Sequence, residues 1–441
     1  MNTASAGFFV KDITPANPVF LAGYPGRRTP SDGVNDPLFL RIAALADGNG
    51  NRVAIVTADL LKFPRDMAWR TKRWAEQALG LPSAALIINL SHTHSAPGLF
   101  HQECYPHWAL DVAYVRDLEA AIRDGLAQAF ADLRPVSVRY GLHQAHFGVS
   151  RRRPDPARPG KVGLGLNPDG YYDPDLPVLA FRDATDGRLR AVLYSYACHP
   201  TSKHENLVSA DYPGEVSRGL KRMLGDDVVT LFAQGGGGSV MPRYNYGTPE
   251  DKAVYAQRWR SVADDLAVFV GSDAMREIPL ELAASEREFG IPYDMSQALS
   301  EAQLLAYADP HEPPLDGFFR PANREILRLW AAGLLERQRT GTQSDAFRMH
   351  VTRWQLCKDL QLIGLSGEVT ADVGRMIKAV EAPRPTIFLG YCSYTDAYIP
   401  TAAMIPEEGH EGKYSIYFHM RPAPFVPAID DIIRREAAKT A

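Results

Sequence analysis

The sequence is short of cysteine and of long apolar runs. Its four cysteines are spread over 441 residues and none stands in C-x-x-C spacing, which excludes a zinc ribbon and a disulfide scaffold. No stretch approaches the roughly 18 consecutive apolar residues that a membrane-spanning helix needs, so we expect no stable membrane insertion. Because the first residues carry no basic segment followed by an apolar one, we expect a cytoplasmic protein.

An excess of either charge is also absent. The 48 Lys and Arg residues face 52 Asp and Glu residues, which gives a net charge of −4 at pH 7. Such a chain has no positive field to hold nucleic acid, so we expect no nucleic-acid partner. Apolar residues make up 45% of the chain and aromatic residues 10%, as in a globular protein with a large core. We expect a small-molecule substrate as partner, and oligomer formation stays open.

Short apolar runs alternate with segments whose apolar residues recur every three to four positions, which is typical of an α/β fold. We expect a mixed β-sheet flanked by helices, in one catalytic domain over residues 1–441 with a mostly helical insertion at about 245–345. Strand patterns at 350–365 and 385–391 are expected to complete the first sheet. The Pro-, Gly- and Asp-rich segment 152–175 predicts a long surface loop. Further expected strands are 37–47, 52–61, 84–92, 136–144, 189–199 and 228–234, and further expected helices are 66–79 and 111–132.

Three histidines stand where apolar strand patterns end. His92 and His94 belong to NLSHTHSAPG, and His199 belongs to YSYACHPTS. Ligands often collect at the ends of strands in an α/β sheet, and side chains at i and i+2 of an extended segment point the same way. Neutral imidazoles are common zinc ligands, although hydrogen-bonded structural histidines would give the same pattern.

One carboxylate occupies a similar place. Glu368, in GLSGEVTADVG, follows the apolar strand LQLIGL and precedes an apparent helix start. Two interpretations stay open for it, a metal ligand and a carboxylate that caps the helix.

The glycine-rich segment AQGGGGSVMPR at 233–243 also follows a strand pattern. It contains no GxxxxGK[ST] phosphate loop and no GxSxG nucleophile elbow. We expect the backbone N–H groups of Gly237 and Gly238 to approach an oxyanion, with the Ser239 hydroxyl beside them.

Over nearly its whole length the chain resembles the neutral/alkaline non-lysosomal ceramidase family. The segments that carry the resemblance are DITP (12–15), LAGYPGR (21–27), DPLFLR (36–41), SHTHSAPG (91–98), SRRR (150–153), CHPTS (198–202), ADYPGE (210–215), QGGGGSVMP (234–242), SGEVT (366–370) and AYIPT (397–401). The resemblance implies a zinc ion, Zn²⁺, held by His92, His199, Glu368 and Tyr398. A buried tyrosine that anchors its turn remains the alternative for Tyr398. The resemblance also implies hydrogen bonds near the metal from His94 and Arg151.

The chain departs from the family pattern in three respects. Ser239 and Met241 stand where family members have Asp and then Ser or Asn, and His410 stands where they have Tyr. We also expect no C-terminal β-sandwich domain. The segments expected nearest the zinc, at 99–108, 150–161 and 239–247, are polar, aromatic and rich in Arg, which suits a hydrophilic ligand.

We therefore predict a zinc-dependent hydrolase in which metal-activated water attacks an amide or related acyl bond, in a substrate more polar than ceramide. His94 or His410 would move protons, and Arg151 with the glycine N–H groups would stabilise the oxyanion. Three alternatives stay open: a true ceramidase, a metal-dependent enzyme that acts on a carbohydrate or lactone, and a non-catalytic ligand-binding protein derived from the family.

Overall fold

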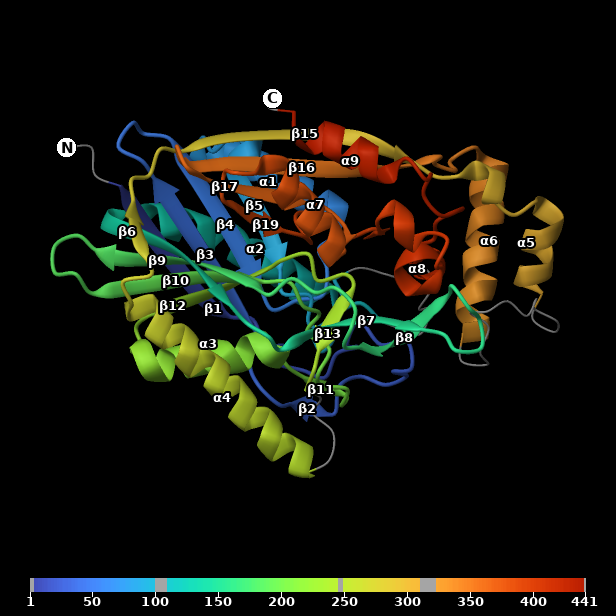
Figure 1. Ribbon diagram of the computed structural model, residues 1–441, viewed down its shortest axis with the longest axis horizontal. Helices are drawn as coiled ribbons and strands as arrows, with labels where there is room; N and C mark the ends of the chain where they lie inside the picture. The colour runs from blue at the N-terminus through green and yellow to red at the C-terminus, as the bar shows by residue number, and fades with distance from the viewer. Residues whose placement is uncertain (1–3, 100–108, 245–248, 310–322, 440–441) are drawn as a thin grey trace.

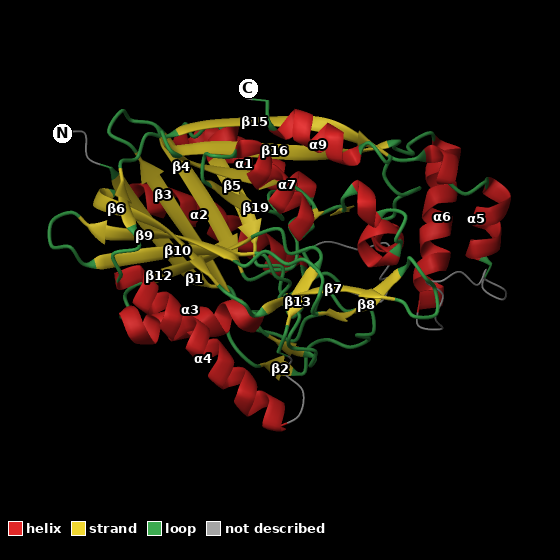
Figure 2. Ribbon diagram, viewed as in Figure 1, coloured by secondary structure: helices red, strands yellow, loops and turns green. Residues whose placement is uncertain are grey.

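The fold is α/β, with mixed β-sheets flanked by helices (Figures 1 and 2). The fold class predicted from the sequence is therefore confirmed. The computed structural model describes residues 4–99, 109–244, 249–309 and 323–439. Most of the segment 99–108 and residues 245–247, which we expected near the site, lie outside these ranges. Within them, no helix has the length and apolar character that crossing a membrane requires.

The largest sheet has nine strands among the described residues. They are β1 (Ser5–Asp12), β3 (Phe39–Ala46), β4 (Arg52–Ala58), β5 (Leu86–Leu90), β6 (Arg134–Gln144), β9 (Asp175–Asp183), β10 (Leu189–Tyr196), β12 (Val229–Gln234) and β14 (Arg276–Ile278). Their order is β12-β10-β9-β6-β1-β3-β4-β5, with β14 beside β6. The end pairs β10–β12 and β4–β5 are parallel and the pairs between them are antiparallel. Strands such as β4 are apolar and buried on both faces, which makes them the centre of the core.

Some helices pack against this sheet, and others pack against the later strands or against one another. The helices are α1 (Arg65–Leu79), α2 (Val112–Ala131), α3 (Asp211–Leu224), α4 (Pro249–Gly271), α5 (Glu301–Ala308), α6 (Arg324–Thr340), α7 (Ala371–Glu381), α8 (Ser415–Phe418) and α9 (Ile429–Ala437). α2 buries Leu118, Ile122 and Leu126, which recur at helical spacing, against β1 and β3. Figure 1 shows α3 and α4 side by side beneath the sheet, and α5 beside α6 at the far right.

The later strands form a second sheet, so our expectation that they complete the first sheet was wrong. β15 (Ala283–Pro292), β16 (Ala346–Cys357), β17 (Leu360–Leu365) and β19 (Thr386–Leu389) pair in that order. Trp354 and Leu362 of this sheet pack into the same apolar core as β4 and β5. An apolar pattern identifies a buried strand but does not say which strand it pairs with, and here the two sheets meet through side chains.

Asn89 of β5 ties the two sheets together. Its Nδ2 donates to the carbonyl oxygens of Gly390 at 2.7 Å and Gln234 at 3.2 Å, and its Oδ1 accepts from the Gln234 N–H at 2.7 Å. Gln234 ends β12, at the opposite end of the strand order from β5. The two ends of the large sheet and the segment after β19 therefore meet at one buried amide.

Part of the segment 152–175 is a β-hairpin, so the predicted long loop was wrong for that part. β7 (Gly148–Pro154) pairs with β8 (Val162–Asn167) on one side and with β13 (Val240–Pro242) on the other. The Pro- and Gly-rich residues 155–160 make only the turn. In β8, Val162, Leu164 and Leu166 alternate with smaller or polar residues, which is a strand pattern that the overall composition concealed.

The region at about 245–345 holds α4, α5 and α6. It also holds β14, which pairs with β6, and β15, which pairs with β16. Residues 245–248 and 310–322 lie outside the described part of the chain. The division of the chain into a catalytic domain and an insertion stays a prediction.

Candidate metal centre

His92 stands where the chain leaves β5. Its φ of +68° is uncommon for a residue with a side chain, and its N–H donates to the carbonyl of Leu60. The imidazole is buried, and its Nδ1 lies 2.7 Å from the carbonyl oxygen of Leu61. Because a carbonyl oxygen only accepts hydrogen bonds, the neutral ring carries its hydrogen on Nδ1 and a lone pair on Nε2.

His199 follows β10 and is held in the same way. Its Nδ1 lies 2.7 Å from the carbonyl oxygen of Gly237, so Nε2 again presents a lone pair. Burial, helped by the Arg151 guanidinium, lowers the pKa of His199 to about 3, and the ring is neutral at pH 7. A Cβ at Gly237 would collide with the side-chain amide of Gln234, so this close approach requires glycine.

The glycine-rich loop thus contributes a carbonyl group, whereas we expected N–H groups. The N–H groups of Gly237 and Gly238 each donate to a backbone carbonyl at 2.8 Å, so neither is directed at a bound oxyanion. Ser239 is 1% exposed, and its Oγ accepts from the Ala371 N–H, 3.2 Å away, at the start of α7. The structure therefore places the Ser239 hydroxyl at a helix terminus rather than beside the imidazoles.

Glu368 and Tyr398 come together through a two-residue parallel ladder. β18 (Glu368–Val369) pairs with β20 (Tyr398–Ile399), and the two residues are direct partners in its register. Both side chains are buried. Burial alone would raise the pKa of the Glu368 carboxyl, whereas protonated imidazoles of His92 and His199 beside it would hold that pKa well below its usual range. With neutral rings, a bound cation would take over this role and keep the carboxylate ionised.

The donor atoms of these four side chains meet in one buried space. Glu368 Oε2 lies 3.2 Å from His92 Nε2 and 3.4 Å from His199 Nε2. Tyr398 Oη lies 3.2 Å from His199 Nε2. Tetrahedral ligands at zinc distances of about 2.0–2.1 Å stand about 3.3–3.4 Å from one another. Glu368 Oε2 has no hydrogen-bond partner among the described residues, so a carboxylate and two lone pairs face each other, an arrangement that fits one divalent cation.

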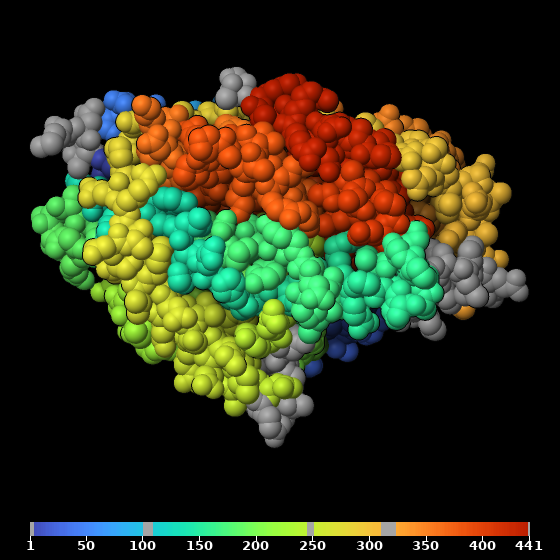
Figure 3. Space-filling view, viewed as in Figure 1, coloured from blue at the N-terminus to red at the C-terminus, as the bar shows by residue number. Residues whose placement is uncertain are grey.

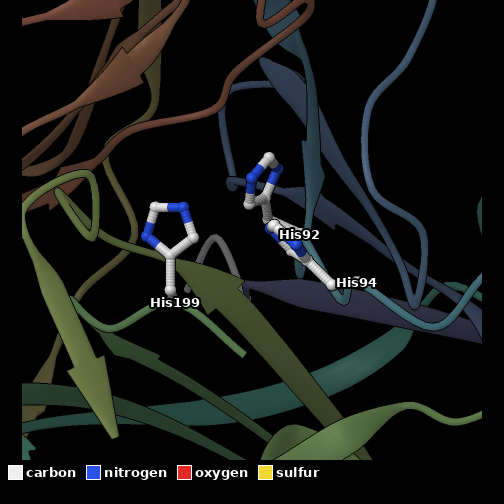
Figure 4. A group of neighbouring side chains, drawn as sticks. All are labelled: His92, His94 and His199. Atoms are coloured by element: carbon white, nitrogen blue, oxygen red, sulfur yellow. The ribbon is translucent and has the colours of Figure 1, made fainter. Parts of the chain in front are cut away.

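A third imidazole, His94, faces the same space (Figure 4). The ligand atoms of His92, His94 and His199 all lie within 4.8 Å of one another. Neither ring nitrogen of His94 has a hydrogen-bond partner in the part of the chain that the structure describes. Burial, together with the neighbouring imidazoles, lowers the pKa of His94 well below its usual value. This neutral ring can bind the same ion or exchange a proton with a group bound beside it.

Residues of the LAGYPGR segment hold the His94 ring, a contact that no single-residue pattern predicts. The ring centroids of Tyr24 and His94 lie 5.0 Å apart. Gly23 has a φ of +102°, and a Cβ there would collide with the imidazole. Arg27 donates to the carbonyl oxygen of His94 and to the Ser95 hydroxyl. This segment therefore fixes the orientation of the third histidine.

Arg151 connects Tyr398 to a buried carboxylate. Its Nη2 donates to Tyr398 Oη at 3.0 Å and its Nε to Glu411 Oε1 at 2.7 Å. Arg152 donates to the other oxygen of Glu411 at 2.6 Å. Burial alone would raise the pKa of Glu411, but the two guanidinium groups lower it to about 2. Glu411, which the sequence did not single out, therefore holds both arginines in place.

Two further histidines lie next to Tyr398. The His410 ring centroid is 4.8 Å from that of Tyr398, and burial together with Arg151 lowers the pKa of His410 to about 4. His419 Nε2 lies 3.6 Å from Glu368 Oε1. Sequence reasoning did not find His419, because it follows the short helix α8 and stands in no motif or strand-end pattern.

The donor cluster opens into a cavity of about 820 Å³. His92, His94, Glu368 and Tyr398 form part of its wall, and His410 also lines it. The β7–β8 hairpin forms another part, and its Val162 N–H donates to the Glu407 carbonyl at 3.0 Å. In Figure 3 the blue-green atoms of the hairpin region lie directly against the red atoms of the C-terminal segments. A cavity of this size can hold a small molecule against the donor atoms.

The fold is similar to that of solved ceramidase structures. A neutral ceramidase from Pseudomonas aeruginosa matches with a TM-score of 0.72 and 19% identity, over 99% of this chain and 73% of that chain. A structure of ceramidase complexed with C2 matches with the same TM-score and identity, over 98% of this chain and 74% of that chain. No protein-family model and no curated protein matches the sequence. The shared feature at this level of identity is the fold.

Proposed function

We propose that this protein is a zinc-dependent hydrolase of the neutral ceramidase type, which cleaves an amide or a related acyl bond. The observation that carries the proposal is the convergence of the donor atoms of His92, His199, Glu368 and Tyr398. Three of the distances between these atoms are 3.2–3.4 Å, and His92, Glu368 and Tyr398 line a large cavity. Two neutral nitrogens, one carboxylate and one phenol oxygen are ligand types that zinc accepts. The similarity of the fold to ceramidase structures supports the same reaction class.

A zinc ion held by these donors would lower the pKa of a bound water and polarise an acyl oxygen. The chain supplies the rest of the chemistry. His94, neutral and without a hydrogen-bond partner among the described residues, accepts a proton from the attacking water. Arg151 donates from Nε to Glu411 and from Nη2 to Tyr398. These contacts hold its positive charge beside the acyl oxygen that becomes negative during the reaction.

The overall reaction adds one water molecule across the acyl bond. The water oxygen joins the acyl carbon, the bond from that carbon to the leaving nitrogen or oxygen breaks, and the leaving group departs with a proton. His94 or His410 returns that proton, since both rings line the cavity. We propose a substrate more polar than ceramide, because charged side chains of the β7–β8 hairpin line the cavity.

The first test compares metal content with turnover. We expect protein purified without chelator to contain close to one zinc per chain by elemental analysis, and to hydrolyse acyl amides at neutral pH. Prolonged chelation should remove the activity, and zinc should restore it. The assay sets a fluorescent short-chain ceramide beside N-acyl compounds with small polar amines, and beside lactones and glycosides.

Each outcome separates the alternatives. Metal-dependent cleavage of ceramide above all other substrates would establish a true ceramidase and overturn the more polar substrate. Cleavage of glycosides alone would contradict acyl hydrolysis. Zinc binding without turnover of any substrate would favour a non-catalytic binding protein, and metal-free protein with full activity would contradict the role of zinc.

A second prediction concerns Ser239. Because its Oγ accepts from the N–H group at the start of α7, Ser239→Ala should lower the free energy of unfolding by about 1 kcal/mol, as loss of a helix cap does. Zinc content and turnover should change little. Urea denaturation and the acyl amide assay measure the two effects. A covalent adduct trapped on Ser239, or loss of turnover with zinc retained, would identify the serine as a nucleophile instead.

A further inference from the structure

The charges that line the cavity do not balance. Among the described residues of its wall, four side chains are cationic and two are carboxylates, namely Lys62, Arg151, Arg153 and Arg158 against Asp155 and Glu368. Glu368 belongs to the metal centre, where a cation would offset its charge. Arg151 and Arg158 are offset by Glu411 and Asp155, which leaves Arg153 as a cation of this wall that can attract an anion.

The acidic side chains around the β7–β8 hairpin are already paired. Each has a cationic partner other than Arg153: Asp155 with Arg158 at 2.8 Å, Glu407 with Arg152 at 2.7 Å, Glu408 with Lys161 at 3.2 Å, and Glu411 with Arg151 at 2.7 Å. Arg153 is an exposed residue of the hairpin, and within the described part of the chain its guanidinium takes part in no hydrogen bond and no ion pair.

The position of Arg153 directs it at the cavity. In β7, Arg151 and Arg153 stand two residues apart, so their side chains leave the same face of the strand, about 7 Å apart. Arg151 reaches Tyr398, and Arg153 lies farther out on the cavity wall. The Arg153 side chain lies across Gly165 of β8, where a Cβ would be 3.0 Å from the guanidinium carbon. Gly165 thus gives the guanidinium room to lie flat along the hairpin.

We infer that Arg153 binds an anionic group on the leaving half of the substrate, and that the substrate is an acyl amide or ester bearing a carboxylate or a phosphate. This inference rests on the proposed hydrolase function. A guanidinium offers two parallel N–H groups that match the two oxygens of either anion. Leu61, Val162 and Phe418, which also line the cavity, provide an apolar wall for the acyl half.

The test uses three probes with the same acyl group. N-hexanoylglycine carries a carboxylate, N-hexanoylphosphoethanolamine carries a phosphate, and N-hexanoylethanolamine is neutral. Calorimetry measures their dissociation constants with wild type and with Arg153→Gln, and turnover is measured separately on zinc-loaded protein. Arg188→Gln is the matched control, because Arg188 is an exposed arginine outside the cavity.

We expect at least one anionic probe to bind more tightly than the neutral probe, and the comparison of carboxylate with phosphate identifies the group. Arg153→Gln should weaken the anionic probe by about 10- to 100-fold, as loss of a charge-assisted hydrogen bond does, and should leave the neutral probe unchanged. Added salt should weaken only the anionic probe. Arg188→Gln should change neither.

Equal binding of neutral and anionic probes, or an unchanged preference in Arg153→Gln, would overturn the inference even if all probes are hydrolysed. Binding that depends on Arg153 without hydrolysis of any probe would support the anion site and contradict the hydrolase function. The two failures are therefore distinguishable.

Discussion

Glu368→Gln and His92→Ala are each expected to remove most of the bound zinc and nearly all hydrolytic turnover. Structural zinc sites with four ligands contribute about 10–16 kcal/mol, so one ligand accounts for roughly 3 kcal/mol, or a factor of about 100 in affinity. In Glu368→Gln the amide keeps the size of the side chain but loses the charge that faces the two Nε2 atoms. Elemental analysis after dialysis and the acyl amide assay measure both losses.

The matched control for the histidine is His146→Ala. His146 is exposed, hydrogen-bonds to Tyr172 and does not line the cavity, so zinc content and turnover should stay at the wild-type level. Circular dichroism shows whether each variant keeps its fold. Wild-type zinc content in both Glu368→Gln and His92→Ala would contradict this metal centre.

Glu411→Gln is expected to cause the largest loss of stability. Glu411 is 3% exposed and joins two buried guanidinium groups. Removing one partner of a buried ion pair leaves uncompensated charge and costs about 3–5 kcal/mol. The free energy of unfolding, measured by urea denaturation at pH 7, should fall by this amount. Glu407→Gln is the control: the Glu407 side chain is 45% exposed and, among the residues that the structure describes, forms an ion pair with Arg152 only, so its loss should cost at most about 1 kcal/mol.

The same ion pairs predict a pH dependence with a definite sign. The pKa of Glu411 falls from its ordinary value of 4.5 to about 2 in the folded protein. A lowered pKa in the folded state stabilises the fold above the unfolded pKa, and this contribution is lost as the pH falls. The stability difference between wild type and Glu411→Gln should be constant above pH 5 and shrink between pH 4.5 and pH 2. A difference that grows over this range would contradict the assignment.

Local patterns were enough to find the strand ends that carry the site. Apolar runs that stop at His92, His199 and Glu368 gave correct strands, and the structure brings these three side chains together. Tyr398 entered only through the resemblance to ceramidases, because a tyrosine that begins a two-residue strand has no sequence pattern of its own. His419 and Glu411 could not be found this way, since they act through contacts that only the tertiary fold creates.

The errors came from features whose local pattern fits more than one use. Glycines at a strand end free both N–H and carbonyl groups, and here the Gly237 carbonyl holds His199 while the N–H groups are occupied. The apolar residues at 350–365 and 385–391 do form strands, as predicted, but these strands belong to the second sheet and not to the first. The Pro- and Gly-rich turn at 155–160 led us to predict a loop, although the adjacent β8 shows alternating apolar residues. In each case the structure depended on which distant segments of the chain pair with each other, and composition does not report that pairing.

The parallel ladder that sets Glu368 beside Tyr398 also determines the earliest point in biosynthesis at which the four donors could hold an ion together. Of the four donor residues, residue 92 is synthesised first and residue 398 last. At about 5–20 residues per second, the time between the two is roughly 15 to 60 seconds. Until residue 398 emerges, the nascent chain carries an incomplete set of donors: first histidines alone, and then histidines with the Glu368 carboxylate. An ion that needs all four donors would therefore bind only after translation of the C-terminal part, and the cations then available would decide which one occupies the site.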